Sequence, residues 1–190
     1  MINFTGKKRL QGVIPALILP FNENGKINFG FLEKQISYLV SSGINGLFIN
    51  GTTGEGAWLT MEEKEQVFKY VKGISKDKVF LCAACLPPTT EMVINEIRIY
   101  EKYEPDYIVA VTPYYYSVSQ DVILEHFKKI ARFSSVPLII YNIPQCTYNK
   151  IQLSTILKLA KEENIAGVKD SSGDFISFTR GMHAPVPENF

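Results

Sequence analysis

Six short apolar segments recur along this chain at nearly constant intervals, and amphipathic stretches of helical length separate them. They predict strands at residues 12–21, 44–50, 79–85, 107–115, 137–144 and 165–172. The strand starts lie 32, 35, 28, 30 and 28 residues apart. Such alternation is typical of βα units built around a parallel sheet.

The intervening stretches predict helices at residues 29–42, 61–76, 89–103, 120–133, 152–163 and 174–183. Thr60 and Glu63 form a capping-box pattern, in which a hydroxyl and a carboxylate satisfy free amides of the first helical turn. Ser119 and Ser154 stand where N-cap residues are expected. The sequence therefore marks several helix starts as well as the helices themselves.

Two parallel architectures accommodate these units, a doubly wound sheet and a (β/α)8 barrel. A doubly wound sheet would place a glycine-rich phosphate loop after its first strand, and residues 20–25 do not form one. Polar or reactive residues instead follow several strands, at 50–55, 112–116, 141–142 and 169–170. Because a barrel gathers its chemistry at the carboxyl ends of its strands, we predict an α/β fold of the (β/α)8 TIM barrel kind.

The length of 190 residues limits how much of a barrel is present. Strand starts lie about 31 residues apart, so six βα units occupy nearly the whole chain. A closed barrel needs roughly 250 residues. We therefore expect residues 1–190 to form a single incomplete barrel domain, which lacks the last two βα units and any C-terminal helices.

Composition narrows the compartment and the partners. Lys and Arg together number 20 against 19 Asp and Glu, so the charge gives no reason to expect a nucleic acid or a membrane as partner. Three cysteines fit a reducing, cytoplasmic compartment better than a disulfide framework. Cys82 and Cys85 fall on opposite faces of a predicted strand, and we interpret both as core. Two distant histidines do not predict a metal site.

Lys169 is the most informative residue. It lies near the end of an apolar predicted strand, where Gly167, Lys169 and Ser171 share one face. An ammonium that points into a barrel mouth is costly to desolvate, which favours the free amine, and a free amine can form a Schiff base with a ketone. From this segment alone, the favoured interpretation is a lysine whose head group simply reaches solvent.

Three other segments add candidates. Tyr141 ends the strand before Lys169, and its phenol could relay protons to a reacting carbon or be an amphipathic core tyrosine. The amides and two threonines of residues 51–56 could hold a carboxylate, although most glycine-rich loops of this kind are only turns. At least one tyrosine of residues 114–116 should face the barrel mouth, with ordinary packing as the alternative.

Taken together, these segments resemble the family of dihydrodipicolinate synthase and N-acetylneuraminate lyase, class I aldolases built on a (β/α)8 barrel. The resemblance runs from about Gly12 to Gly173. Two regions carry it: residues 46–56, which read GLFINGTTGEG, and the tetrapeptide YNIP at 141–144, followed 28 residues after its tyrosine by Lys169.

The resemblance implies roles for the matched residues. Lys169 would capture pyruvate, or the keto group of a 2-keto acid, as a Schiff base, and Tyr141 would donate and accept protons without a metal or organic cofactor. Gly51, Thr52 and Thr53 would hold the pyruvate carboxylate. Thr52 also belongs to the implied catalytic set, and Thr53 would relay protons to Tyr141.

Tyr115, the remaining member of the implied catalytic set, concerns the assembly. It matches a tyrosine that members of this family lend to a neighbouring subunit's site. This implies a homodimer or homotetramer when the protein is full length. The other partners implied are small molecules: pyruvate with an aldehyde, or a 2-keto acid.

Cys146 departs from the family pattern. In dihydrodipicolinate synthases this position, two residues after Pro144, typically holds an arginine that grips the second substrate's carboxylate, and a thiol cannot replace a guanidinium. We therefore expect a lyase or aldolase acting on a 2-keto-3-deoxy sugar acid or a sialic acid. The alternatives are 4-hydroxy-tetrahydrodipicolinate synthase, which joins pyruvate and aspartate semialdehyde in lysine biosynthesis, and a non-catalytic truncated fragment.

Overall fold

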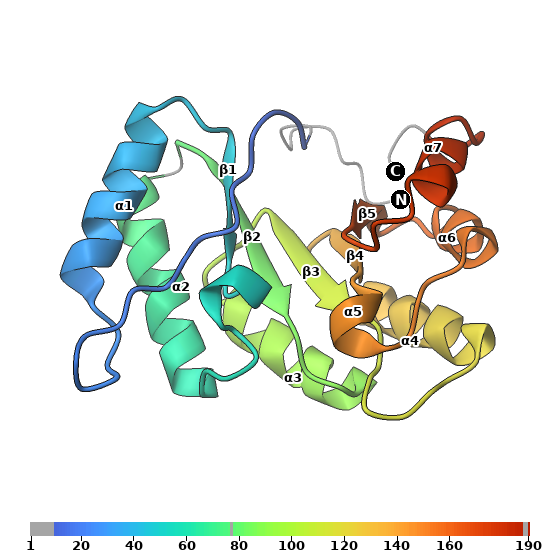
Figure 1. Cartoon of the computed structure of the whole chain (residues 1–190), viewed down its shortest axis with the longest axis horizontal. Coiled ribbons are helices and arrows are strands. Elements are labelled where there is room, and N and C mark those ends of the chain that lie inside the picture. Colours follow the sequence, from blue (N-terminus) through green and yellow to red (C-terminus); the bar gives the residue numbers. More distant parts are fainter. Residues whose placement is uncertain (1–9, 77, 188–189) are drawn as a thin grey trace.

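The computed structural model describes residues 10–76, 78–187 and 190, and its centre is a parallel sheet of five strands in the order β1-β2-β3-β4-β5 (Figure 1). The strands are β1 (Gly46–Ile49), β2 (Phe80–Cys85), β3 (Tyr107–Val111), β4 (Leu138–Asn142) and β5 (Ile165–Asp170). Each strand pairs with its predecessor in the chain, as successive units of a barrel do, whereas a doubly wound sheet reverses direction at a switch point. The predicted barrel architecture is confirmed, in the form of an open arc.

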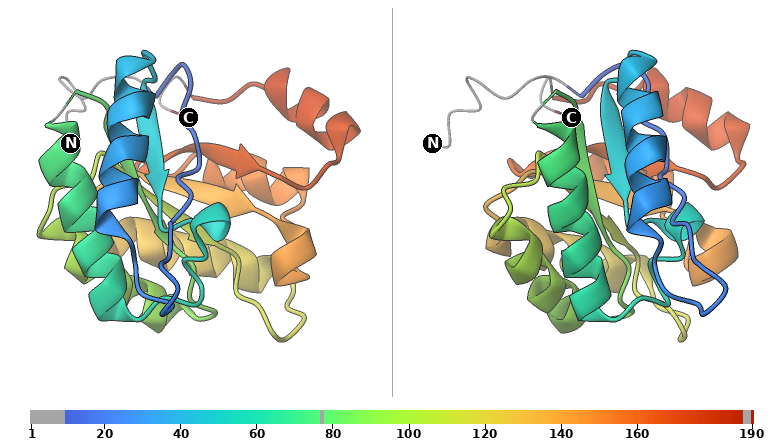
Figure 2. Two further views of the ribbon diagram at one scale, coloured as in Figure 1. Left: turned by 60° about the vertical axis from the view of Figure 1, so that its left-hand side comes forward. Right: turned by 90° about the vertical axis from the view of Figure 1, so that its left-hand side faces the viewer.

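The longer helices cover one face of this arc (Figure 2). They are α1 (Phe29–Ser41), α2 (Met61–Ser75), α3 (Thr90–Glu101), α4 (Gln120–Phe133) and α6 (Leu153–Leu159), with α7 (Phe175–Met182) after β5. The 3-10 turn η1 (Thr52–Gly54) and the short helix α5 (Pro144–Thr147) lie instead at the carboxyl ends of β1 and β4. The larger core cluster joins buried side chains of α1, α2, α3, α4 and α6 to alternate residues of the strands. The opposite face of the sheet is therefore free to form the inner wall of the barrel.

The capping signals explain where two helices begin. Glu63 N donates to Thr60 Oγ1 at 3.2 Å, and Thr60 N donates to Glu63 Oε2 at 2.9 Å, so the predicted capping box is confirmed. Ser119 caps α4 as predicted. The N-cap predicted at Ser154 is wrong, because α6 starts after Gln152 and Ser154 already lies in its first turn.

The strand predicted at residues 12–21 is also wrong. This segment runs beside β1 but contributes only two isolated bridges, one between Ala16 and Phe48 of β1 and one between Phe21 and Ile27. Pro15 and Pro20 interrupt any longer ladder because proline has no amide hydrogen to donate. The described part of the sheet consequently has five strands where the sequence predicted six.

Two predicted strands end earlier than expected for the same reason. β3 ends at Val111 and β4 at Asn142, shortly before Pro113 and Pro144. Neither proline can continue a hydrogen-bonded ladder. Pro144 instead opens α5, because its fixed φ suits the first turn of a helix.

The two faces of the sheet carry separate cores. On β2, Cys82 and Ala84 belong to the inner cluster, whereas Ala83 and Cys85 belong to the cluster beneath the helices. The predicted opposite orientation of the two cysteines is confirmed. The inner cluster also contains Tyr141, which therefore points toward the concave side of the arc.

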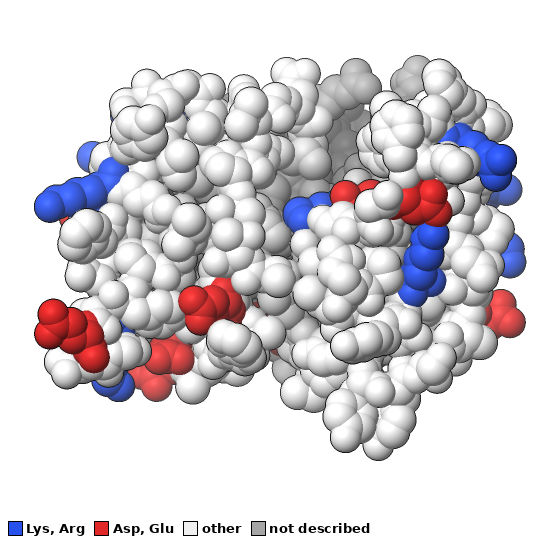
Figure 3. All heavy atoms as spheres, viewed as in Figure 1, with Lys and Arg blue, Asp and Glu red and all other residues white. Residues whose placement is uncertain are grey.

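The surface carries charges of both signs. Acidic and basic side chains are interspersed on the face seen in Figure 3, and uncharged residues occupy most of it. Across the described ranges, no helix is both long and apolar enough to cross a membrane.

Candidate active site

Lys169 and Tyr141 face each other across β5 and β4. The Lys169 Nζ lies 3.7 Å from the centre of the Tyr141 ring and 5.3 Å from that of Phe48. The two rings meet edge to face with their centroids 6.0 Å apart, and both side chains are buried. Lys169 itself is only partly buried, and its amine rests against the Tyr141 and Phe48 rings.

An irregularity in β5 turns Lys169 to this side. Leu138 pairs with Ile165, but the next residue of β4 pairs with Gly167, so β5 contains one extra residue. Gly167 has a φ of 154°, a value that side-chain-bearing residues rarely adopt. A one-residue slip moves every later side chain to the other face. Had the register set by Leu138 and Ile165 continued, Tyr141 would pair with Val168 instead of Lys169.

Ser171 connects the amine and the phenol. Lys169 Nζ donates to Ser171 Oγ at 3.1 Å, and Ser171 Oγ donates to Tyr141 Oη at 3.5 Å. The alternation along the strand predicted that Ser171 shares a face with Lys169, but it did not predict this bridging role. A hydroxyl in this position can pass a proton between the two groups.

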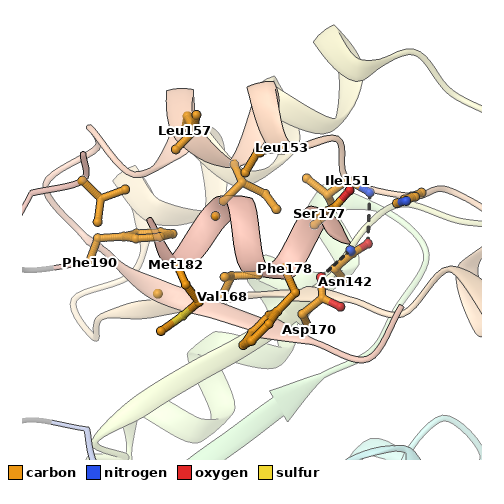
Figure 4. Close-up of a pocket in the computed structure, with 15 residues that line it drawn as sticks. Asn142, Ile151, Leu153, Leu157, Val168, Asp170, Ser177, Phe178, Met182 and Phe190 are labelled. Carbon is orange, nitrogen blue, oxygen red and sulfur yellow. Dashed lines mark hydrogen bonds between the residues drawn. The ribbon is translucent and has the colours of Figure 1, made fainter. Parts of the chain in front are cut away.

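The reverse side of the same strand pair is held by polar contacts (Figure 4). Asn142 Nδ2 donates to Asp170 Oδ2 at 2.8 Å, and Asn142 Oδ1 accepts from Ile151 N at 3.0 Å. These contacts border a mostly apolar cavity of about 330 Å³ between β5, α6 and α7. The cavity contains none of the predicted site residues, so it is separate from the candidate active site.

The glycine-threonine loop, residues 51–56, packs against Phe48, one of the two rings beside Lys169. Gly51 is buried, and a Cβ at this position would lie 2.2 Å from the Phe48 ring. Thr52 and Thr53 are exposed in η1, which begins directly after Gly51. Phe48, which the sequence did not single out, thus connects the predicted carboxylate loop to Lys169.

A second cavity, of about 430 Å³, opens beside the loop. Its lining includes Thr52, Glu55, Tyr114 and Cys146. Tyr114 is therefore the tyrosine of the 114–116 run that faces the mouth, as one of the three was expected to do. The exposed Cys146 thiol lies on this cavity together with Thr52.

Tyr115 does not join the other candidates within its own chain. It is 84% exposed and has a φ of 80°, an uncommon value for a residue with a side chain. Among the described residues, its one ring contact is with the neighbouring Tyr116, at a centroid distance of 5.0 Å. The side chain therefore extends from the surface at the carboxyl end of the sheet.

Other titratable groups belong to the scaffold. Burial raises the pKa of Cys82 to about 12 and the pKa of Cys85 well above its usual value, so both are protonated core thiols. Burial lowers the pKa of His126 to about 4. Within the described residues, no three His, Cys, Asp or Glu side chains gather as metal ligands.

Comparison with known proteins identifies relatives of this arrangement. Residues 9–188 match the model of the Dihydrodipicolinate synthetase family. The 4-hydroxy-tetrahydrodipicolinate synthase of Bdellovibrio bacteriovorus is 37% identical over 166 residues, which are 87% of this chain and 56% of that protein.

Solved structures agree with the sequence match. The dihydrodipicolinate synthase of Acinetobacter baumannii, complexed with pyruvate, has a TM-score of 0.88 and 31% identity over 90% of this chain and 59% of its own. CdNal of Clostridium difficile, in complex with mannosamine, has a TM-score of 0.86 and 29% identity over 91% of this chain and 60% of its own. The chain thus spans 56–60% of the length of these relatives.

Proposed function

The chain belongs to the dihydrodipicolinate synthetase family, and we propose that it provides the Schiff-base site of a class I aldolase that uses pyruvate. The observation that carries the proposal is the lysine nitrogen 3.7 Å from the Tyr141 ring centre on the inner face of the sheet. The solved relative in complex with pyruvate supports this choice of substrate.

The proposed reaction needs an amine, a proton relay and a carboxylate site. The Lys169 amine adds to the keto carbon of pyruvate, water leaves, and an imine forms. Loss of one methyl proton gives an enamine, whose carbon attacks the aldehyde carbon and forms the C–C bond. Tyr141 accepts and returns the protons, with Ser171 between phenol and amine. Water then hydrolyses the imine and releases the product and the free lysine.

The loop at residues 51–56 would hold the pyruvate carboxylate. It presents the exposed Thr52 and Thr53 at the carboxyl end of β1, whereas the Gly54, Glu55 and Gly56 amides are hydrogen bonded within the loop. The threonine hydroxyls are suitable donors for a carboxylate. The contact of Gly51 with Phe48 supports this role, because it sets the loop against the ring that also borders Lys169.

For the second substrate, the curated relatives favour 4-hydroxy-tetrahydrodipicolinate synthase over the sugar-acid aldolase expected from the sequence. We therefore take aspartate semialdehyde as the first candidate. The sugar-acid reading is the second candidate, supported by the Cys146 thiol on the cavity and by the likeness to CdNal in complex with mannosamine. An assay with pyruvate plus aspartate semialdehyde, run beside one with 2-keto-3-deoxy sugar acids, separates the two candidates.

A variant sharpens this comparison. If aspartate semialdehyde is the substrate, Cys146→Arg should raise kcat/KM for it, because a guanidinium can bind a carboxylate bidentately. Val122→Arg, at an exposed position of α4 outside the cavity lining, is the control. Greater turnover of a 2-keto-3-deoxy sugar acid than of pyruvate plus aspartate semialdehyde would favour the second candidate.

Trapping tests the Schiff base itself. Incubation with pyruvate and borohydride should add one pyruvyl group to Lys169, located by peptide mass spectrometry. Lys169→Met should abolish the adduct, and Lys150→Met, at an exposed ion pair with Asp174, should leave it unchanged. An unmodified Lys169 in a folded protein would rule out the proposed function.

We also propose that Tyr115 completes the site of a second copy when two copies assemble. Its exposure and its left-handed backbone support this role. Mixing the inactive variants Tyr115→Phe and Lys169→Met should restore part of the activity, because a mixed dimer contains one intact site. No recovery in a mixture that forms dimers would contradict shared sites.

A further inference from the structure

A buried polar network lies between the sheet and helices α2 and α3. Lys64 Nζ is 2.9 Å from Glu96 Oε1, and the two side chains are 7% and 1% exposed. The Tyr100 hydroxyl donates to Glu96 Oε1 at 3.3 Å and accepts a hydrogen bond from Asn50 Nδ2 at 2.9 Å. All four residues are buried.

Asn50 connects this network to the glycine-threonine loop. It follows β1 directly, has a φ of 57°, and its Nδ2 also donates to the Lys64 carbonyl at 3.0 Å. The loop leaves from Asn50 at Gly51 and returns to it at Gly56, where a Cβ would lie 1.8 Å from the Asn50 carbonyl oxygen. Both ends of the loop therefore rest on this one residue.

Stability alone does not account for a buried ion pair at this position. Desolvation of the two charges offsets their attraction, so apolar side chains of similar size often stabilise a fold as well or better. Burial raises the pKa of Glu96 even though Lys64 acts to lower it. Glu96 Oε2 and Asn50 Oδ1 have no hydrogen-bond partner among the described residues. The network instead fixes the orientation of the Asn50 side chain through its hydrogen bonds.

We infer that Lys64, Glu96 and Tyr100 are positioning residues: they hold Asn50 in its left-handed conformation and so set the course of the loop at residues 51–56. The ligand assigned to the loop rests on the proposed function, whereas the ordering of the loop does not. Loss of the network should therefore loosen the loop and weaken pyruvate binding while leaving Lys169 and Tyr141 in place.

Tyr100→Phe is the mildest variant that tests this inference. It removes the hydroxyl between Asn50 and Glu96 and keeps the ring, which packs on Phe68 with centroids 5.1 Å apart. Tyr103→Phe is the matched control. Tyr103 also packs near Phe68, at 6.4 Å, but its hydroxyl donates to Glu65.

Amide hydrogen exchange measures how well the loop is ordered. The Gly54, Glu55 and Gly56 amides are hydrogen bonded within the loop, to Gly51 and Thr52 carbonyls. We expect them to exchange about tenfold faster in Tyr100→Phe and at the original rate in Tyr103→Phe, with α4 amides unchanged in both. Loop exchange at the original rate, or equal acceleration of every amide, would overturn the inference.

A paired variant separates positioning from stability. Lys64→Met combined with Glu96→Met removes both charges, so we expect a melting temperature at or above that of the original chain and faster exchange of the loop amides. Slow loop exchange in this paired variant would also contradict the inference.

Pyruvate trapping supplies the functional measurement. In Tyr100→Phe the pyruvate concentration for half-maximal borohydride trapping should rise about tenfold, with the same final extent of Lys169 labelling. An unchanged half-maximal concentration would overturn the link to pyruvate binding. Absence of labelling in the original chain would instead refute the proposed function, and the exchange measurement would still decide whether the network orders the loop.

Discussion

The Lys169 amine lies 3.7 Å from the centre of the Tyr141 ring because β5 contains one extra residue before the lysine. The irregularity brings a nucleophile and a phenol together on the inner face. On the outer face, the adjacent residues Asn142 and Asp170 are joined by a hydrogen bond of 2.8 Å. The hydrogen bond on the outer face therefore links β4 and β5 at the same level at which their inner face carries the reactive groups.

Tyr141→Phe should slow proton transfer without unfolding the protein. The ring stays against Phe48, so we expect unfolding free energy to change by less than about 1 kcal/mol. Exchange of the pyruvate methyl protons for deuterium, followed by NMR, should slow by about 10²–10⁴-fold. Tyr38→Phe, on the exposed side of α1, should exchange at the original rate. Unchanged exchange in Tyr141→Phe would exclude the phenol as the relay.

Gly51→Ala and Gly73→Ala should have opposite effects on stability. A Cβ on Gly51 would lie 2.2 Å from the Phe48 ring, so we expect a loss of about 1–3 kcal/mol. Gly73 lies within α2 with nothing inside 4 Å of its Cβ position, so alanine should add about 0.5–1 kcal/mol. Urea unfolding measures both, and a shift of the same sign in the two variants would contradict this account of Gly51.

His126 should make stability depend on pH. Its Nε2 lies 3.0 Å from the Val111 carbonyl oxygen and its Nδ1 2.9 Å from Thr90 Oγ1, and burial lowers its pKa to about 4. An unfolded histidine has a pKa of about 6.5, so between these values the unfolded state binds more protons. Stability contributed by His126 is therefore complete above pH 6.5 and declines as the pH falls toward 4, by about 3 kcal/mol in all.

The difference between variants isolates this contribution from that of the carboxyl groups. The difference between the free energies of unfolding at pH 7 and at pH 4.5 should be smaller in His126→Gln than in the original chain. His183→Gln, at the exposed second histidine, should keep the original pH dependence. Equal slopes in all three proteins would show that His126 does not contribute.

The three cysteines should differ in reactivity. Cys146 is exposed, whereas Cys82 and Cys85 are buried with raised pKa values. We expect one thiol per folded chain to react rapidly with an aromatic disulfide reagent at pH 8, and all three in denaturant. Cys146→Ser should remove the rapid phase. Fast labelling of two or more thiols in the folded chain would contradict the burial of β2.

Local patterns in the sequence account for much of the fold. The capping box at Thr60 and Glu63 and the alternating faces of β2 depend on residues within a few positions of one another, so both could be predicted. The predicted strand at 12–21 failed because strand formation depends on the pairing partner as well as on apolar residues. With Pro15 unable to donate, only one bridge to Phe48 forms.

The candidate site divides in the same way. Hydrophobic period and motif spacing are properties of the chain, so the order of the βα units and the candidate residues Lys169, Tyr141 and the loop at 51–56 could be predicted. The extra residue in β5 that turns Lys169 inward could not be, nor could the contacts from α2 and α3 that hold Asn50 and the loop. Those outcomes rest on contacts between residues far apart in the chain, and such contacts are made only when the elements pack.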